Sequence, residues 1–462
     1  MFKTLTAARA LQYFQVMRLI VLVFISIVLA KSNIGIAEIG VYETLTWLGT
    51  TLSLFWTVGL LQGFVTLYGH YRTPAFLWDN VAGNTPSVNP VSPTPLIQKF
   101  GIEYVTKAFI FNTFFVFCLL SLGLYILLSF GSSSLLFYLT GLSKPPTYYG
   151  WFCLYILFFI PSFIVEYIYL VHQRGRAIFL WGIISFGTQL LFLILPLQWG
   201  FGLNGAMIAW SIWSVFRFIW TCYTVYYYGI ISIIPELIKE HLRFSQPLVL
   251  SIVVGNLILF FDNWLVGWYY HDESVFAIFR YGAREFPLAT AMTGALGAAM
   301  IPQLTAGFPA GMEYLKKEGL RLMHLLFPLA MALMLVSVPL FPVIFNPGFA
   351  ASASIFNIYL LVTASRLLLP ATVVLALGKP KLIYYVGIIE LLVKIITGFV
   401  FIQIWGLTGL AWSVVLSYWV EKIGLIWYLE KKIQIKTKDW LSIRTFTIYS
   451  LMLLTVWIIL NF

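Results

Sequence analysis

Long runs of apolar residues alternate along the chain with short polar connections. A helix needs about 20 apolar residues to cross a bilayer, and thirteen segments approach or exceed that length. They are residues 10–30, 38–69, 100–130, 149–171, 175–197, 203–228, 245–270, 274–305, 319–345, 352–377, 381–404, 407–430 and 441–461. The pattern predicts an all-α polytopic membrane protein with twelve core transmembrane helices and an extra hydrophobic helix at the C-terminus.

Lys and Arg gather in every second connection and at the N-terminus. The basic stretches are 3–9, 72–99, 174–176, 239–243, 316–321, 379–381 and 431–438, whereas each intervening connection holds at most one Lys or Arg. Basic loops stay on the cytoplasmic side of a membrane. We therefore expect a multi-pass protein with a cytoplasmic N-terminus and a cytoplasmic segment 431–438. A thirteenth span would then place the C-terminus outside.

The composition excludes several classes of protein. With 61% hydrophobic and only 10% charged residues, the chain has too few charges to cover a soluble surface. The net charge of +11 belongs to the connections, so it indicates membrane topology and no nucleic-acid partner. The three cysteines lie in apolar runs, and HExxH, CxxC, Walker and GxSxG motifs do not occur. No catalytic residue, metal or cofactor is predicted, and we expect a transporter and not an enzyme.

The two halves of the chain resemble each other. RGRAIFLWGII, from Arg174, matches KPKLIYYVGII, from Lys379, and QWGFGLNGAMIAWS, from Gln198, matches QIWGLTGLAWS, from Gln403. Both matches have an offset of about 205 residues. Because each half starts and ends inside, this predicts a parallel repeat of two six-helix lobes, an architecture of transporters. The predicted domains are a lobe at 1–228, a cytoplasmic amphipathic linker at 229–244, a lobe at 245–431, and a basic segment with the extra helix at 432–462.

Three ionisable residues lie near the start of the apolar segment 274–305: Arg280, Arg284 and Glu285. If the segment is one continuous helix, Arg280 lies roughly 9 Å and Arg284 roughly 15 Å below its outer end. A charge in hydrocarbon costs at least ~2.5–3.5 kcal/mol, so both arginines should face a cavity or a partner. Positions 287, 291, 294, 298 and 302 would continue their stripe with Pro, Ala and Gly, which allow a ligand to come close. Glu285 should face a neighbouring helix.

Asp262, on the preceding span, lies at a depth between the two arginines, roughly 12 Å below the outer end. It either forms a structural ion pair with Arg280 or Arg284, or lines a site with them. In both cases one carboxylate cannot neutralise two arginines, and this favours an anionic ligand. Glu43 lies at a similar depth on the second span, and we expect it to pair with the free arginine when no ligand is bound.

The remaining intramembrane charges have simpler interpretations. We expect Arg217 and Arg366 to extend to the cytoplasmic surface. Glu390 and Lys394 are four residues apart on one helix and should form an ion pair. The residues expected at the membrane interface are Glu166, Glu421 and Lys422.

Two segments resemble a known family: VFAIFRYGAREFPLATAMTGALGAAMIPQL, from Val275, and GIAEIGVYETLTWLGTTLSLFWTVGLLQG, from Gly35. With the twelve helices in two lobes, they are similar to the polysaccharide-flippase (Wzx-type) branch of the multidrug/oligosaccharidyl-lipid/polysaccharide (MOP) exporter superfamily. The resemblance covers nearly the whole chain. The proline-rich loop after the second span and the C-terminal segment depart from it.

This resemblance implies a V-shaped, MATE-like fold that opens alternately to either side of the bacterial cytoplasmic (inner) membrane. It implies a monomer that moves a polyprenyl-diphosphate-linked oligosaccharide, such as an O-antigen unit of lipopolysaccharide, to the outer leaflet. Contacts with membrane lipids and with other polysaccharide-assembly proteins are also implied. The implied substrate-binding residues are Arg18, Glu43, Asp262, Arg280 and Arg284.

Two alternatives differ in chemistry. A cation-coupled multidrug exporter of the same fold would need an acidic cavity, whereas the candidates here lean basic. A polytopic lipid-linked glycosyltransferase or polymerase would carry catalytic carboxylates on outer loops, which here are short, with only the cluster at 271–273. A diphosphate-linked sugar needs a cationic path through hydrocarbon, because burying an unpaired phosphate is prohibitive, and arginine binds phosphate oxygens in bidentate fashion.

Overall fold

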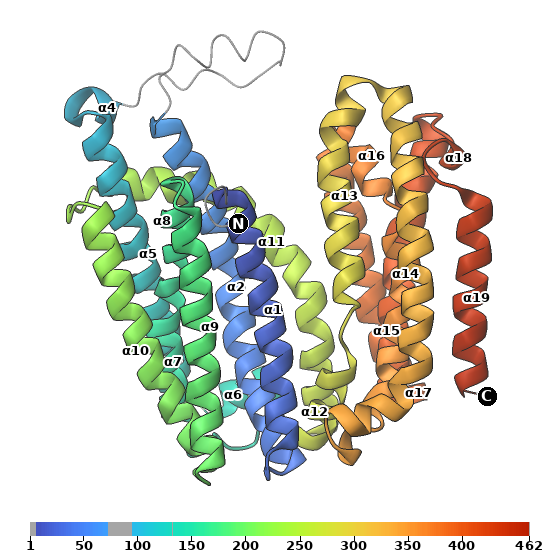
Figure 1. The fold of residues 1–462 in the computed structure, drawn as a ribbon, viewed down its shortest axis with the longest axis horizontal. Helices are drawn as coiled ribbons and strands as arrows, with labels where there is room; N and C mark the ends of the chain where they lie inside the picture. Colours follow the sequence, from blue (N-terminus) through green and yellow to red (C-terminus); the bar gives the residue numbers. More distant parts are fainter. Residues whose placement is uncertain (1–5, 73–94, 132, 462) are drawn as a thin grey trace. The chain divides into compact units, whose positions relative to one another are not determined.

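A computed structural model describes residues 6–72, 95–131 and 133–461, and within these ranges every regular element is a helix (Figure 1). The all-α prediction is therefore confirmed. Most of the proline-rich loop predicted at 72–99 lies outside the described residues. By their internal contacts, the helices divide into two compact units.

Unit 1 comprises the residues up to Ile34 together with Leu45–Asn256. Its helices are α1 (Ala7–Lys31), most of α2 (Ile36–Arg72), α4 (Pro95–Phe100), α5 (Ile102–Phe130), α6 (Ser133–Thr140), α7 (Tyr149–Phe159), η2 (Ile160–Ile164), α8 (Val165–Val171), α9 (Gly175–Gln198), α10 (Gly202–Tyr228) and the first half of α11 (Pro235–Tyr270). The chain runs continuously through α7, η2 and α8, which together form one span with Pro161 at its 3₁₀ turn.

Unit 2 comprises Gly35–Thr44, which is the first part of α2, and Leu257–Phe462. It holds the second half of α11 and α12 (Glu273–Gly282), α13 (Pro287–Ala306), α14 (Phe308–Ile344), η3 (Pro347–Phe349), α15 (Ser352–Arg366), α16 (Pro370–Ala376), α17 (Pro380–Lys432), α18 (Thr437–Trp440) and α19 (Ile443–Asn461). The four-domain division of the sequence stays a prediction, since grouping by contacts does not define repeat boundaries.

The predicted apolar segments can be assigned to helices of the structure. Among the described residues, nine helices are long and apolar enough to cross a membrane, or ten if the bent α11 is one span. One of the nine, α17, has 53 residues and would be ~80 Å long if straight. It contains Gly406 at φ 61°, where two spans meet. With α10 and the broken pair α12–α13, the helices account for all thirteen predicted segments.

The predicted repeat is visible in the local geometry of the connections. Before α9, the N–H of Gln173 donates to Leu170 and the N–H of Arg174 to Tyr169. Before the first half of α17, Gly378 donates to Leu375 and Lys379 to Val374, with the same spacings. The residue at the turn has positive φ in both places, 57° at Gln173 and 68° at Gly378. A helix C-terminus is thus closed in the same way 205 positions apart.

Of the amphipathic linker predicted at 229–244, residues 235–244 form the start of α11, and residues 229–234 precede the helix. Residues Pro235–Leu250 form a helix that meets Gly255–Tyr270 at an angle of 41°. Pro247 lies just before this bend, where it removes one backbone hydrogen bond of the helix. Leu237, His241 and Ser245 are buried along one face of the first part. This stretch is therefore held against unit 1 and leads directly into the next span.

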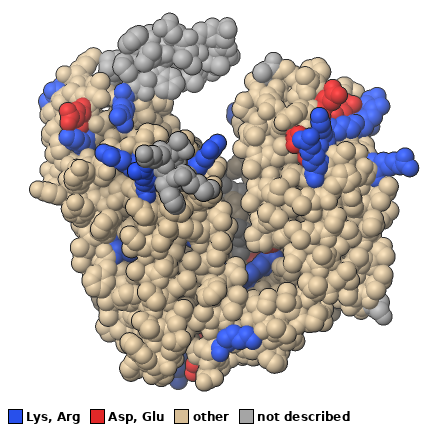
Figure 2. Space-filling model, in the orientation of Figure 1, with Lys and Arg blue, Asp and Glu red and all other residues tan. Residues whose placement is uncertain are grey.

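Charged residues collect at one end of each unit. In Figure 2 most visible Lys and Arg lie toward the end of unit 1 that holds α4 and the end of unit 2 that holds α18, while the sides of both units are nearly uncharged. Apolar sides between charged ends are expected of a bundle that spans a bilayer. The assignment of the basic ends to the cytoplasm stays a prediction from the sequence.

Cysteine labelling in intact cells tests this topology. In a background without Cys118, Cys153 and Cys222, we expect single cysteines placed at Ser87 and Lys432 to resist an impermeant maleimide until the cells are permeabilised. A cysteine at Lys144, in a connection predicted to be external, is the matched control and should react at once. Labelling of the first two positions before permeabilisation would overturn the orientation.

Candidate functional site

The segment that carries the two arginines is not one continuous helix. Helix α12 begins after Asp272, whose carboxylate accepts hydrogen bonds from the N–H groups of Ser274 and Val275, and it ends at Gly282. Helix α13 begins at Pro287. A residue before proline avoids the helical region, and Phe286 is extended, with φ −63° and ψ 105°. The predicted stripe from Arg280 through Arg284 to position 302 is therefore wrong.

Arg280, in the last turn of α12, faces Glu43 of α2. Its Nε lies 3.6 Å from Glu43 Oε2. Gly40, one turn before Glu43, makes the approach possible, because an added Cβ would lie 1.8 Å from the backbone oxygen of Glu273. The expected pairing of Glu43 with an arginine is confirmed. The Arg280 side chain is 34% exposed, whereas that of Glu43 is 9% exposed, so the open side of the pair is positive.

Arg284 lies in the non-helical break between α12 and α13. Its guanidinium lies 5.3 Å from the centre of the Tyr281 ring, and the side chain is half-buried. Tyr281 in turn stacks on Phe349 with ring centres 4.2 Å apart. An arginine over an aromatic face is held in place by a cation–π contact.

Glu285 faces other helices, as expected, and accepts hydrogen bonds from three of them. Arg366, at the end of α15, donates from Nε at 3.1 Å and from Nη2 at 2.7 Å to the carboxylate, and Tyr418 of α17 donates to it as well. Thr290 of α13 donates a further hydrogen bond at 3.2 Å. The prediction that Arg366 extends to the cytoplasmic surface is therefore wrong, because its guanidinium is bound bidentately by a carboxylate.

Asp262, in the second half of α11, pairs with neither arginine. Its Oδ2 lies 2.8 Å from Lys394 Nζ of α17 and accepts a long hydrogen bond, 3.5 Å, from Tyr359 of α15. Both charged side chains are almost completely buried, with 1% exposure at Lys394 and 6% at Asp262. The predicted Asp262–arginine pair is corrected, and so is the expected Glu390–Lys394 pair, because the Lys394 ammonium points to Asp262.

Unit 1 holds Arg18 and Arg217 within its apolar helices. The guanidinium of Arg18 lies 5.4 Å from the Phe163 ring, and the side chain is half-buried. Arg217 is 5% exposed, donates to Ser162 and Ser185, and lies among the rings of three aromatic residues. These rings belong to Phe159, Trp181 and Trp213. Arg217 therefore does not extend to the cytoplasmic surface as predicted.

The three residues expected at the membrane interface are packed inside their units. Glu166 is 4% exposed in unit 1. In unit 2, Lys422 and Glu421 form an ion pair of 2.5 Å with side-chain exposures of 11% and 13%. Lys422 lies 205 positions after Arg217, so the repeat places a buried cation at the same point in both units.

The charges of unit 2 differ in how tightly they are held. The carboxylates of Asp262 and Glu285 are bound at 2.7–2.8 Å by cations of neighbouring helices. Arg280 has a longer contact, 3.6 Å, and is one third exposed.

Discontinuous transmembrane helices commonly hold anionic groups at the start of their second part, where backbone N–H groups are free. The break before α13, with Arg280 and Arg284 beside it, is therefore suited to an anion. Among the described residues, no group of three His, Cys, Asp or Glu side chains could hold a metal ion.

Solved structures with the same fold are membrane transporters. The chain aligns with the lipid II flippase MurJ in an inward closed conformation at a TM-score of 0.67 and 15% identity, over 97% of this chain and 92% of that one. The MATE transporter VcmN of Vibrio cholerae, in its bent form, aligns at a TM-score of 0.54 and 15% identity, covering 96% and 98%. A MOP superfamily transporter from Pyrococcus furiosus, described as having a binding pocket of reverse polarity, aligns at 0.57 and 15%, covering 91% and 94%.

This likeness confirms the predicted fold class of two six-helix lobes with an additional C-terminal helix. No protein-family model and no curated protein sequence matches the chain. With identities near 15%, the shared property is the fold. The function must therefore be argued from the residues themselves.

Proposed function

We propose that this protein is a MOP-superfamily flippase of the polysaccharide branch in the bacterial cytoplasmic membrane. Its cargo would be a polyprenyl-diphosphate-linked oligosaccharide, moved from the inner to the outer leaflet by alternating access. No bond of the cargo needs to be broken, since the protein supplies a path for a polar head through hydrocarbon.

The observation that carries this proposal is the sign of the accessible charge in unit 2. Cations engage the carboxylates of Glu43, Asp262 and Glu285, whose side chains are 9%, 6% and 19% exposed. Arg280 is 34% exposed and its contact with Glu43 is 3.6 Å long. A diphosphate oxygen could replace the Glu43 carboxylate on Arg280 and gain a shorter, charge-assisted contact.

Arg284, Asp262 and Arg18 have different roles in this proposal. Arg284 lies four residues after Arg280, in the break next to the start of α13, and would bind the same diphosphate. Asp262 would act indirectly, by joining α11 to α17 through Lys394. Arg18 would contact cargo separately, on unit 1, where its guanidinium lies over Phe163.

The second candidate is a multidrug exporter, because MATE transporters share the fold. A cationic drug needs an accessible acidic group, and the carboxylates named above are engaged by Lys or Arg. Releasing Asp262 or Glu285 from its cation would cost several kcal/mol, as for a buried pair, and Glu43, whose contact is longer, is only 9% exposed. The accessible arginine therefore favours the flippase.

Reconstitution into proteoliposomes distinguishes the two functions. With a fluorescent polyprenyl-diphosphate oligosaccharide in both leaflets, we expect the protein to speed the exchange of cargo to the outer leaflet, where an added glycosidase removes the label. The cationic dye rhodamine 6G is the matched probe and should not be transported. Transport of the dye without movement of the lipid-linked sugar would favour the exporter.

A further inference from the structure

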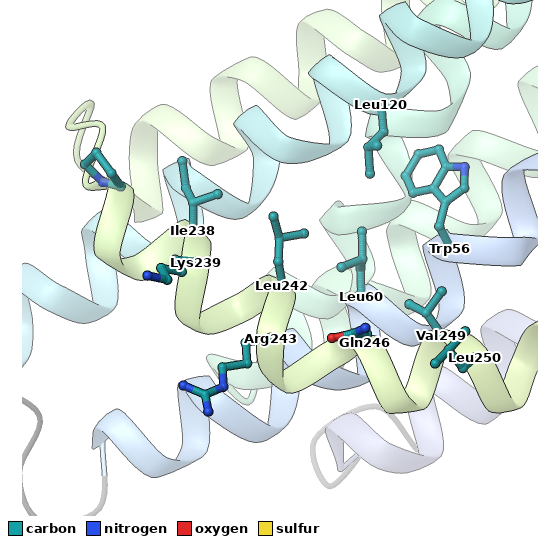
Figure 3. Close-up of a pocket in the computed structure, with 11 residues that line it drawn as sticks. Trp56, Leu60, Leu120, Ile238, Lys239, Leu242, Arg243, Gln246, Val249 and Leu250 are labelled. Atoms are coloured by element: carbon teal, nitrogen blue, oxygen red, sulfur yellow. The ribbon is translucent and has the colours of Figure 1, made fainter.

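A groove with a volume of about 770 Å³ opens on unit 1 beside the first half of α11. Its apolar lining comes from Trp56 and Leu60 of α2, Leu120 of α5, and Ile238, Leu242 and Leu250 of α11. Figure 3 shows these side chains around the space between α11 and the helices behind it. The volume is within the range of ~300–1,000 Å³ that is usual for small-molecule sites.

Two cations stand at the edge of this groove. Lys239 and Arg243 also line it, and both are exposed. They are four residues apart on one helix, so their side chains are neighbours on its surface. In Figure 3 their charged ends extend away from the apolar side chains. None of the ion pairs among the described residues involves either cation.

The groove is not filled by the neighbouring helices that the structure describes, because the face of α11 that packs against them is not the face that lines the groove. His241 Nε2 lies 2.9 Å from the backbone oxygen of Leu60, and its ring meets Phe109 edge-on. Gly63 lies close against Ser245, where an added Cβ would be 1.9 Å from Oγ. The buried face therefore holds the helix, and the apolar residues beside it stay uncovered: Leu242 is 43% exposed.

We propose that this groove binds an anionic phospholipid of the surrounding bilayer. One acyl chain would lie along Leu242 and Leu250, and the phosphate would lie between Lys239 and Arg243. An apolar groove with cations at one edge matches the chemistry of a lipid that carries negative charge at one end. Residues 239–243 also belong to the connections predicted to be cytoplasmic, and the cytoplasmic leaflet is the one rich in anionic lipids.

This site is separate from the proposed cargo site. It uses residues of α2, α5 and α11 in unit 1 and none of the arginines of α12 or the break. Loss of cargo transport would therefore leave the lipid proposal intact, and the reverse also holds.

Binding of two lipids that differ only in charge tests the proposal. The delipidated full-length protein would be mixed with palmitoyl-oleoyl phosphatidylglycerol or the matching phosphatidylcholine, and bound lipid counted by native mass spectrometry. We expect phosphatidylglycerol to bind more tightly. Lys239→Gln with Arg243→Gln should weaken it about thirty-fold, since each cation near an anionic lipid contributes roughly 1 kcal/mol.

Matched variants separate this site from general charge effects. Lys317→Gln with Lys381→Gln removes the same charge from two exposed positions of unit 2 and should leave binding unchanged. Leu242→Trp fills the apolar part while keeping both cations, and should weaken phosphatidylglycerol binding. Lys239→Arg with Arg243→Lys keeps both charges and should retain it.

Cross-linking locates the lipid without any mutation. A phosphatidylglycerol with a diazirine at the end of one acyl chain should label peptides from α2, α5 or residues 235–250 of α11. Equal binding of both lipids to the unaltered protein would overturn the proposal. The proposal would also be overturned if Lys317→Gln with Lys381→Gln weakened phosphatidylglycerol binding as much as the groove variant does. Labelling of other helices alone would overturn it as well.

Discussion

Lys394→Met should lower the free energy of unfolding by about 3–5 kcal/mol, as expected when one partner of a buried ion pair is removed. Lys394 Nζ lies 2.8 Å from Asp262 Oδ2, and the two side chains are 1% and 6% exposed. Without the ammonium, the partner left to the Asp262 carboxylate among the described residues would be Tyr359, through its long hydrogen bond. A charge that is buried without its partner must be solvated by moving helices or be neutralised by a proton.

The double variant Asp262→Leu with Lys394→Met should recover most of this loss. Replacing both partners of a buried pair with apolar groups of similar size is often neutral. Unfolding of the purified protein by sodium dodecyl sulfate in mixed micelles, followed by circular dichroism, measures the difference. Lys381→Met, at an exposed position, is the control for the loss of a lysine. Equal destabilisation by the single and double variants would contradict the pair's role.

The spans were predictable from the sequence because bilayer thickness fixes the length of an apolar helix. The repeat was predictable because its turns need particular residues. At Gly202 and Gly406 the φ angles are 60° and 61°, so the matching glycines mark backbone positions that favour glycine.

The break between α12 and α13 was missed although a local signal existed. Pro287 disfavours helix at the residue before it and commonly begins a new one.

The ion-pair partners were mostly not predictable. Glu390 and Lys394 are four apart on one helix, which favours a local pair, yet Lys394 reaches Asp262, 132 positions earlier. That choice depends on α11 and α17 being neighbours, which no local pattern encodes. Arg217 was placed at the surface because long side chains can extend to water. Its actual surroundings, three aromatic rings from different helices and two serines, come from folding.

The Glu43–Arg280 pair was predictable because it needed only depth and charge. Both residues lie at a similar distance from the outer ends of spans that were assigned by length, and their charges are opposite. Gly40 is the feature that the sequence did not flag, since its contact with Glu273 brings α2 against α12. The pair's length of 3.6 Å and the exposure of Arg280 could be obtained only from the structure. The proposed binding role of Arg280 rests on these two properties.

Arg280→Gln should reduce transport of a polyprenyl-diphosphate oligosaccharide about thirty-fold or more. Losing one charged, partly buried contact to an anion costs about 2–5 kcal/mol. Arg280→Lys should restore only part of the activity, because an ammonium cannot reproduce the planar fork of a guanidinium. The proteoliposome assay measures this at equal protein per vesicle. The same variants should unfold at nearly the temperature of the unaltered protein, because the contact with Glu43 is long and the Arg280 side chain is one third exposed.

Glu43→Gln is the matched control, because it breaks the same ion pair and leaves the arginine in place. If Arg280 binds the diphosphate, Glu43→Gln should keep most of the transport, and the double variant with Arg280→Gln should be as inactive as Arg280→Gln alone. If the pair only joins α2 to α12, both single variants should lose transport equally, and the neutral double should recover it, as two amides can hydrogen-bond across the same gap. Recovery in the double variant would falsify the role of Arg280 in binding cargo, whatever happens to Arg284.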